Sequence, residues 1–100
     1  MPVKWTPGAK ADVLNLVAYI SQDRPDAARR MAAKLRAAAS SLRGLPEMGR
    51  MVPEFDEPSI RELVVRPYRL VYRVKEEFVD ILAVVHSRRA MTEALVEQVE

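Results

Sequence analysis

The chain has 100 residues and a mass of 11.3 kDa, which is enough for one domain over residues 1–100. Hydrophobic residues make up 49% and charged residues 30% of the sequence, a composition that excludes an intrinsically disordered chain. No apolar run approaches the roughly 20 residues of a transmembrane helix. The first residues lack the basic-then-apolar order of a signal peptide, and the absence of cysteine excludes a disulfide framework. We expect a small cytoplasmic protein without membrane association.

The net charge of +2 hides an uneven distribution of charge along the chain. Residues 1–50 hold nine Lys and Arg against four Asp and Glu, whereas residues 51–100 hold seven against ten. Each half contains one basic cluster, namely Arg29, Arg30, Lys34, Arg36 and Arg43, then Arg61, Arg66, Arg69, Arg73 and Lys75. Both clusters are open to two interpretations, an electrostatic partner or a solvated face of the protein.

The first 45 residues predict a short strand followed by a helical hairpin. Residues 3–6 are rich in β-formers, and Thr6 can cap a helix that has Pro7 at its first position. Apolar residues then recur at helical spacing, at Val13, Leu14, Val17 and Ile20. Pro25 favours the start of a second helix, whose alanine-rich apolar stripe continues for about four turns.

After Gly49 the hydrophobic period changes from 3.6 to 2, which predicts strands at residues 60–65, 68–74 and 78–85. Their connections are short enough for antiparallel hairpins. Alternation in the second of these strands places Leu70 and Tyr72 on one side and Arg69 and Val71 on the other. The third strand is nearly apolar on both faces, so we expect it inside the sheet.

These elements predict an α+β fold. An N-terminal strand and an antiparallel helical hairpin pack on a small antiparallel β-sheet of three or four strands, and a short helix capped by Thr92 covers residues 92–100.

Few kinds of chemistry are available to this sequence. Three glycines and no glycine-rich loop exclude a phosphate-cradling motif, and one histidine without cysteine indicates no metal site, so we expect no cofactor. His86, at the end of the inner strand, is open to two interpretations: an acid or base near neutral pH, or a histidine hydrogen-bonded to the backbone where the strand leaves the sheet.

Arginines on the predicted strands form the other candidate site. Arg61, Arg69 and Arg73 lie on strands that should be neighbours, and Arg88 and Arg89 follow the inner strand directly. If these guanidinium groups gather on one face of the sheet, they suit phosphate or carboxylate partners. A solvated outer face of the sheet is the alternative interpretation.

An ordered set of short motifs resembles the RelE/ParE superfamily of type II toxins. The set runs over nearly the whole chain: Trp5-Thr6-Pro7 with Ala9 and Asp12, Ala27-Ala28, Leu45-Pro46 with Gly49-Arg50, Arg61-Glu62-Leu63, Tyr68-Arg69-Leu70-Val71-Tyr72-Arg73 and Val84-Val85-His86-Ser87-Arg88-Arg89. The resemblance implies a bacterial growth-inhibiting toxin that a co-encoded antitoxin neutralises by direct binding, and the fold of that superfamily agrees with the elements predicted above.

The superfamily contains two activities. RelE-like members are ribosome-dependent endoribonucleases that cut mRNA, whereas ParE-like, plasmid-stabilising members poison DNA gyrase. RNA cleavage needs a base, an acid and a cation for the phosphorane. Here Arg69 matches the family arginine, Arg88 or Arg89 matches a second one, and His86 is the one candidate acid or base. The terminal tyrosine and the lysine pair of several RelE members have no counterpart, and the His-x-Arg-Arg ending is similar to ParE.

The resemblance therefore favours a ParE-like toxin that binds DNA gyrase and a ParD-like antitoxin, and that contacts DNA only indirectly through the antitoxin. On this hypothesis Arg61, Arg69, Arg73, Arg88 and Arg89 are interaction residues. A RelE-like nuclease acting on the ribosome with Arg69, His86, Arg88 and Arg89, or a non-toxic protein that only binds its antitoxin, are the alternatives. Apolar contacts to the antitoxin are expected on the first helix, at Leu14, Leu16, Val17 and Ile20, because a helix that is apolar on more than one side needs a second surface to cover it.

Overall fold

A computed structural model describes residues 1–88 of the chain. Arg89 and the helix predicted at residues 92–100 lie outside the described residues. In chain order the elements are β1 (Val3–Trp5), α1 (Pro7–Ser21), α2 (Pro25–Ser41), β2 (Arg50–Met51), β3 (Ile60–Val65), β4 (Tyr68–Val74) and β5 (Val79–His86).

The two helices begin where the sequence predicts. The Thr6 hydroxyl oxygen accepts a hydrogen bond from the Ala9 amide at 3.1 Å and donates one to the Ile81 carbonyl oxygen at 2.7 Å. This cap therefore also ties the start of α1 to β5. Pro7 and Pro25 occupy the first turns of α1 and α2, where a missing amide hydrogen costs no helical hydrogen bond. The predicted helical hairpin is confirmed.

The five strands form one mixed sheet in the order β1-β5-β4-β3-β2. The predicted antiparallel pairing holds for β3, β4 and β5, and the interior place of β5 is confirmed. β2 adds to this sheet by antiparallel pairing with β3. β1, whose pairing was not predicted, joins the edge of this sheet in parallel with β5, so that the whole sheet is mixed. Parallel neighbours need a long crossover, and the helical hairpin provides it. β2 was not predicted, since two residues carry no hydrophobic period.

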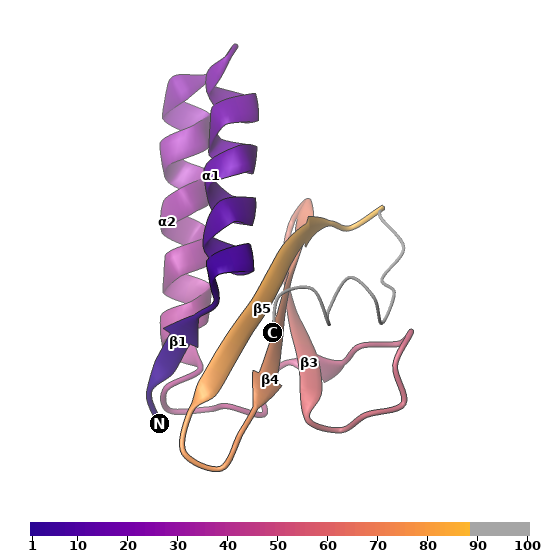
Figure 1. Cartoon of the computed structure of the whole chain (residues 1–100). Coiled ribbons are helices and arrows are strands. Elements are labelled where there is room, and N and C mark those ends of the chain that lie inside the picture. The colour runs from indigo at the N-terminus through magenta and orange to yellow at the C-terminus, as the bar shows by residue number, and fades with distance from the viewer. Residues whose placement is uncertain (89–100) are drawn as a thin grey trace.

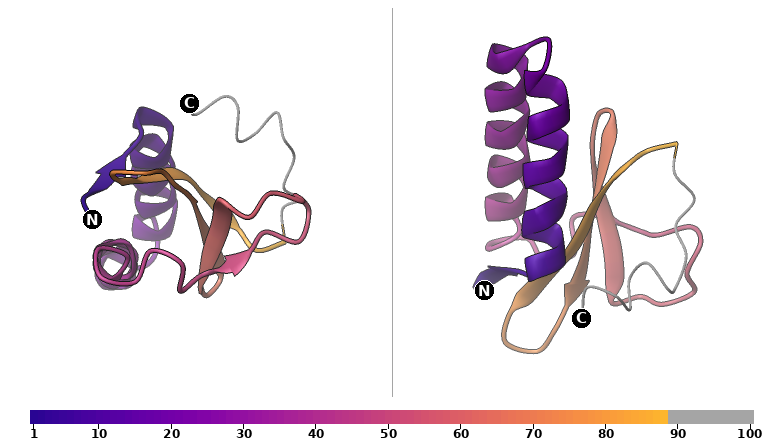
Figure 2. Two further views of the ribbon diagram at one scale, coloured as in Figure 1. Left: turned by 90° about the horizontal axis from the view of Figure 1, so that it is seen from below. Right: turned by 45° about the horizontal axis from the view of Figure 1, so that its top comes forward.

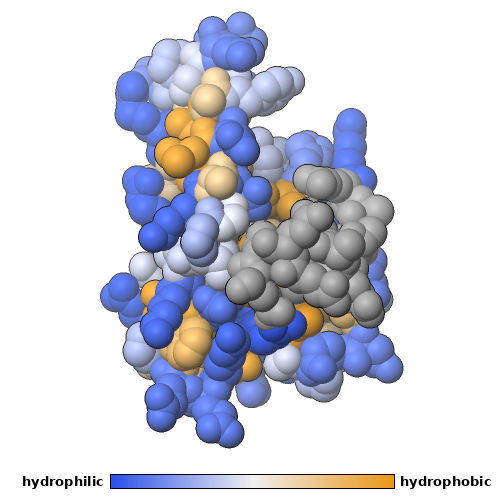
Figure 3. All heavy atoms as spheres, viewed as in Figure 1, coloured by the Kyte–Doolittle hydropathy of each residue, from blue (hydrophilic) through white to orange (hydrophobic). Residues whose placement is uncertain are grey.

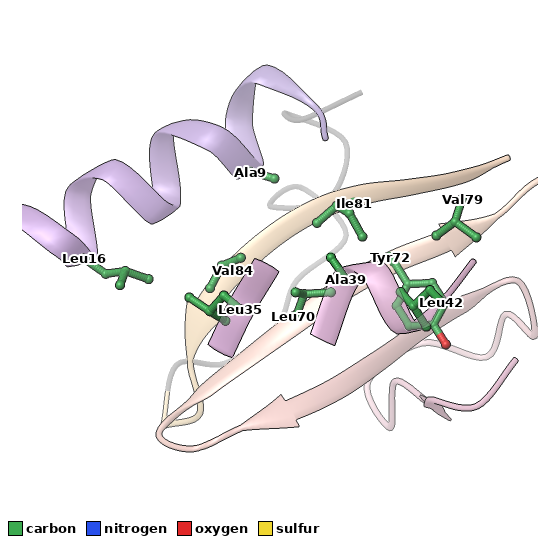
Figure 4. Packing of buried hydrophobic residues seen from close by; sticks show 10 residues of the cluster. All are labelled: Ala9, Leu16, Leu35, Ala39, Leu42, Leu70, Tyr72, Val79, Ile81 and Val84. Atoms are coloured by element: carbon green, nitrogen blue, oxygen red, sulfur yellow. The ribbon is translucent and has the colours of Figure 1, made fainter. Parts of the chain in front are cut away.

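Both helices pack on one face of the sheet (Figures 1 and 2). Their small and aliphatic side chains meet those of β4 and β5 in the main core, shown in Figure 4: Ala9, Leu16, Leu35, Ala39, Leu42, Leu70, Tyr72, Val79, Ile81 and Val84. Alanines on the buried side of α2 let the backbone come close to α1 and the sheet.

The opposite face of the sheet carries a second, smaller apolar cluster, made of Val52, Ile60, Val71, Leu82, Ala83 and Val85, with Phe55 packed on it. Register explains why β5 is apolar throughout. Val71 pairs with Ala83 but Tyr72 pairs with Ile81, so Leu82 is an extra residue in β5. The bulge places Leu82 and Ala83 in the same cluster. The segment between β2 and β3 supplies Val52 and Phe55 and covers part of this second face.

Candidate functional site

Arg69 stands at the centre of a charge network on the sheet face that points away from the helices. Its Nε donates to Glu62 Oε1 on β3 at 2.6 Å. Its two terminal nitrogens donate to both carboxylate oxygens of Glu54, on the segment between β2 and β3, at 2.9 and 2.8 Å. On the other side, Arg50 Nε donates to Glu62 Oε2 at 2.6 Å. Two carboxylates therefore hold the Arg69 guanidinium.

Burial makes this network part of the fold. The Glu62 side chain is fully buried, and that of Arg69 is 7% exposed. The hydrogen bonds from Arg69 to Glu54 raise the pKa of the guanidinium above its ordinary value, and burial opposes this rise only in part. Arg69 thus clamps the segment that carries Glu54 against the sheet. Its guanidinium is already bonded to two carboxylates of the chain itself.

A shallow depression of about 530 Å³ opens beside this network and is lined by Arg50, Pro53, Glu54, Val64, Arg66, Arg69 and Ser87. Exposed Arg50 and Arg66 give its rim positive charge. The lining contains no histidine, lysine or tyrosine, and its carboxylate, Glu54, accepts hydrogen bonds from both terminal nitrogens of Arg69. The depression therefore mainly offers electrostatic attraction for an anion.

His86 lies on the other face of the sheet. Across the β4–β5 ladder His86 pairs with Tyr68, whereas Arg69 pairs with Val85, and directly paired residues point to the same side. The imidazole ring makes an edge-to-face contact with Tyr68 at 5.8 Å between centroids. Its Nδ1 accepts a hydrogen bond from the Arg88 amide at 3.2 Å. Of the two interpretations of this histidine, the structure shows the backbone-bonded one.

The remaining arginines do not form a single row with Arg69. Arg61 pairs with Tyr72 and so points to the helix side, where its Nη1 donates to the Gly49 carbonyl oxygen at 2.9 Å. The expectation of one shared face is therefore wrong for Arg61. Arg73 is on the same side as Arg69 and is half-buried, and Arg88 is exposed just after β5.

Helix α1 carries two large apolar side chains that are exposed. Leu14 is 71% exposed and Tyr19 is 74% exposed. A mainly apolar groove of about 360 Å³ runs beside Leu14 and is lined by Trp5, Lys10, Val13, Leu14 and Arg36. Figure 3 shows hydrophobic surface on the helical hairpin, in the upper left of the view. This groove, with cations at its rim, suits an amphipathic acidic partner.

Of the four predicted contact residues on α1, Leu14 alone is freely exposed. Leu16 belongs to the buried core, and Val17 and Ile20 are half-buried against it. The prediction of Leu16 as a contact residue is wrong because both sides of α1 are apolar, and the sequence does not say which side the sheet covers. Tyr19 was missed, as were Glu54 and Glu62. For Glu62 a signal existed, since strand alternation places it on the side of Ile60.

Among residues 1–88, no group of three or more His, Asp or Glu side chains is arranged to hold a metal ion. Neither helix in that part of the chain has the length and apolar character needed to span a bilayer.

Comparisons with known proteins give consistent results. A family model described as the ParE toxin of the type II toxin–antitoxin system parDE matches residues 3–91. Toxin RelE2 of Caulobacter vibrioides is 42% identical over 88 residues, covering 87% of this chain and 96% of the relative. Putative toxin Y4kP of Sinorhizobium fredii is 35% identical, covering 93% and 95%. A solved structure of the chromosomal ParDE system from P. aeruginosa superposes with a TM-score of 0.73 at 25% identity, covering 86% of this chain and 95% of that one.

Proposed function

The chain belongs to the family of ParE toxins of type II toxin–antitoxin systems, and on this basis we propose that it arrests growth by acting on DNA gyrase and that a co-encoded ParD-like antitoxin neutralises it by direct binding. Both events take place in the cytoplasm. The observation that carries the choice of gyrase is the position of Arg69 and His86 on opposite faces of the sheet.

The alternative is a ribosome-dependent mRNA endonuclease. The name of the Caulobacter relative, toxin RelE2, agrees with this alternative. Cleavage by the 2′-hydroxyl needs a proton acceptor, a proton donor and a cation around the same phosphate. Here the matching arginine is held by Glu54 and Glu62, and the one imidazole points away from it. These observations support a non-nucleolytic mechanism.

The antitoxin interface is proposed on α1. Leu14 exposes apolar surface, and the adjoining groove carries Lys10 and Arg36 at its rim. Tyr19 is exposed on another side of the helix. An antitoxin segment that folds into an amphipathic helix would bury its apolar side in this groove and place its carboxylates near the two cations. Arg61, Arg73, Arg88 and Arg89 remain proposed contacts for the antitoxin or for gyrase.

A paired assay with purified protein tests the target. One arm contains DNA gyrase, ATP and supercoiled plasmid, and the other contains ribosomes translating a defined mRNA. We expect linearised plasmid and intact mRNA, and we expect His86→Ala to change plasmid cleavage by less than about twofold because this side chain contacts Tyr68 and accepts a hydrogen bond from the Arg88 amide, both within the chain.

Cut mRNA with untouched plasmid would instead establish the nuclease alternative, and His86→Ala would then abolish cleavage. No effect in either arm, together with tight antitoxin binding, would identify a protein that only binds its antitoxin.

A further inference from the structure

The outer side of α2 carries a basic surface that the fold does not use. The helix contains four cations, Arg29, Arg30, Lys34 and Arg36, and a single carboxylate, Asp26 in its first turn. All four cations are exposed. Asp26 pairs with Arg29. Within residues 1–88, no carboxylate is paired with Arg30, Lys34 or Arg36.

Helical geometry arranges these cations in two rows. Arg29 and Arg36 are seven residues apart, about 10 Å along the axis, and Arg43 continues the same line just beyond the helix. Arg30 and Lys34, four residues apart, form the second row on the other flank. The side between the rows holds the small exposed residues Ala33, Ala37 and Ser40, with Asp26 at its N-terminal end.

The row on the Arg36 flank extends beyond α2. Arg36 lines the same groove as Lys10 of α1, and the N-terminal ammonium group donates a hydrogen bond to the Arg43 carbonyl oxygen at 2.9 Å. The basic surface of α2, defined as Arg29, Arg30, Lys34, Arg36 and Arg43, is thus continuous with further positive charge. The helix itself is 17 residues long, about 25 Å. The row from Arg29 to Arg43 covers about 20 Å, more than half a turn of duplex, whereas Arg30 and Lys34 are about 6 Å apart along the axis.

We propose that this basic surface binds the phosphate backbone of duplex DNA. The small alanine and serine side chains between the rows let the helix approach the duplex closely. Cations on both flanks of the helix then reach phosphates on either side. Single-stranded nucleic acid is disfavoured because α2 contains no aromatic residue for stacking on bases. An acidic helical peptide is disfavoured because no large apolar side chain lies between the rows, and the exposed anchors Leu14 and Tyr19 belong to α1.

This inference does not depend on gyrase, since binding is a property of the free chain. It extends the proposed function, because a toxin acting on gyrase works beside duplex DNA. The family resemblance implies contact with DNA only through the antitoxin, so direct binding by the toxin would be an additional interaction.

The test is a fluorescence anisotropy titration of a labelled duplex of about 20 base pairs with the full chain, over a salt series from about 50 to 200 mM. The test variant is Arg30→Gln/Lys34→Gln. Its matched control, Lys4→Gln/Lys75→Gln, removes the same number of charges from two lysines that lie beside Phe78 and outside α2. Circular dichroism confirms that each protein is folded.

We expect the test variant to bind about tenfold more weakly than the wild type at the lowest salt, and the slope of log K against log salt to decrease in magnitude by about 1.8. The control should retain wild-type affinity within about twofold. Equal losses in the two variants would overturn the proposal, because they would indicate an effect of net charge alone. Tighter binding of a single-stranded RNA, or binding of an acidic peptide without binding of the duplex, would overturn it as well.

Discussion

The charge network predicts that Arg69→Met lowers the free energy of unfolding strongly. The substitution removes the donors to Glu54 and Glu62 but keeps an apolar side chain of similar length. Glu62, whose side chain is fully buried, then retains only the bond from Arg50 at 2.6 Å. Breaking a buried ion pair by removing one partner costs about 3–5 kcal/mol, a large share of the roughly 5–15 kcal/mol that stabilises a small domain.

The same reasoning predicts that the second variant Arg69→Met/Glu62→Leu regains most of the lost stability, because an apolar pair replaces the ion pair and leaves no buried charge. Glu54→Gln should cost only about 1 kcal/mol, since the Glu54 side chain is 33% exposed and can return to water.

Urea unfolding followed by the fluorescence of Trp5, the single tryptophan, measures all three free energies of unfolding. The account of Arg69 as a clamp would be refuted if Arg69→Met lost less than about 1 kcal/mol while it abolished activity in the gyrase assay. That result would return Arg69 to the target-binding residues of the sequence hypothesis.

Further predictions follow from burial and close contact. Leu14→Asp should leave the free energy of unfolding within about 0.5 kcal/mol of wild type but weaken antitoxin binding, measured by calorimetry, by more than about tenfold. Leu16→Ala should instead destabilise the fold by about 2–5 kcal/mol. Unchanged antitoxin affinity in Leu14→Asp would contradict the α1 interface. Gly49→Ala should cost about 1–3 kcal/mol in urea unfolding, because a Cβ there would lie 2.6 Å from both a carbonyl oxygen and the Tyr72 hydroxyl; a variant as stable as wild type would contradict this close approach. Burial raises the pKa of Tyr72. The protonated phenol therefore stabilises the fold below the pKa of the unfolded chain, and this stabilisation is lost as pH rises through the pKa of the folded chain. The free energy of unfolding should fall above about pH 10, and it should fall less steeply in Tyr72→Phe.

Local signals explain the parts of the fold that the sequence predicts. A capping threonine followed by proline starts α1, and Pro25 starts α2, because both effects act within one turn of helix. The bounds of β3 and β4 follow from two runs rich in β-forming residues that a short connection at Arg66-Pro67 separates.

Features that depend on partners far away in the sequence could not be predicted from local signals. β1 pairs with a strand more than seventy residues away, and nothing local fixes a parallel or antiparallel direction. Arg61 changes face with a shift of one residue in register, and only the partner Tyr72 settles the register. The bulge at Leu82 likewise appears only when β5 is aligned with β4.

The candidate site was predicted in its residue types but not in its connections. The arginines were visible in the sequence, whereas the carboxylates that hold Arg69 were not recognised as its partners. Glu54 lies 15 residues away on a segment without regular structure, and no period or spacing links the two. A cationic motif in a sequence therefore indicates a binding site only when the chain itself does not neutralise it.

The most direct test of the proposed target is pulse labelling of cells after induction of the toxin, with thymidine and leucine incorporation followed in parallel. The proposed action on gyrase predicts that thymidine incorporation falls first, while leucine incorporation continues until DNA damage accumulates, and that co-expression of the antitoxin prevents both effects. An immediate fall of leucine incorporation with continued DNA synthesis would contradict it and would establish action on the ribosome.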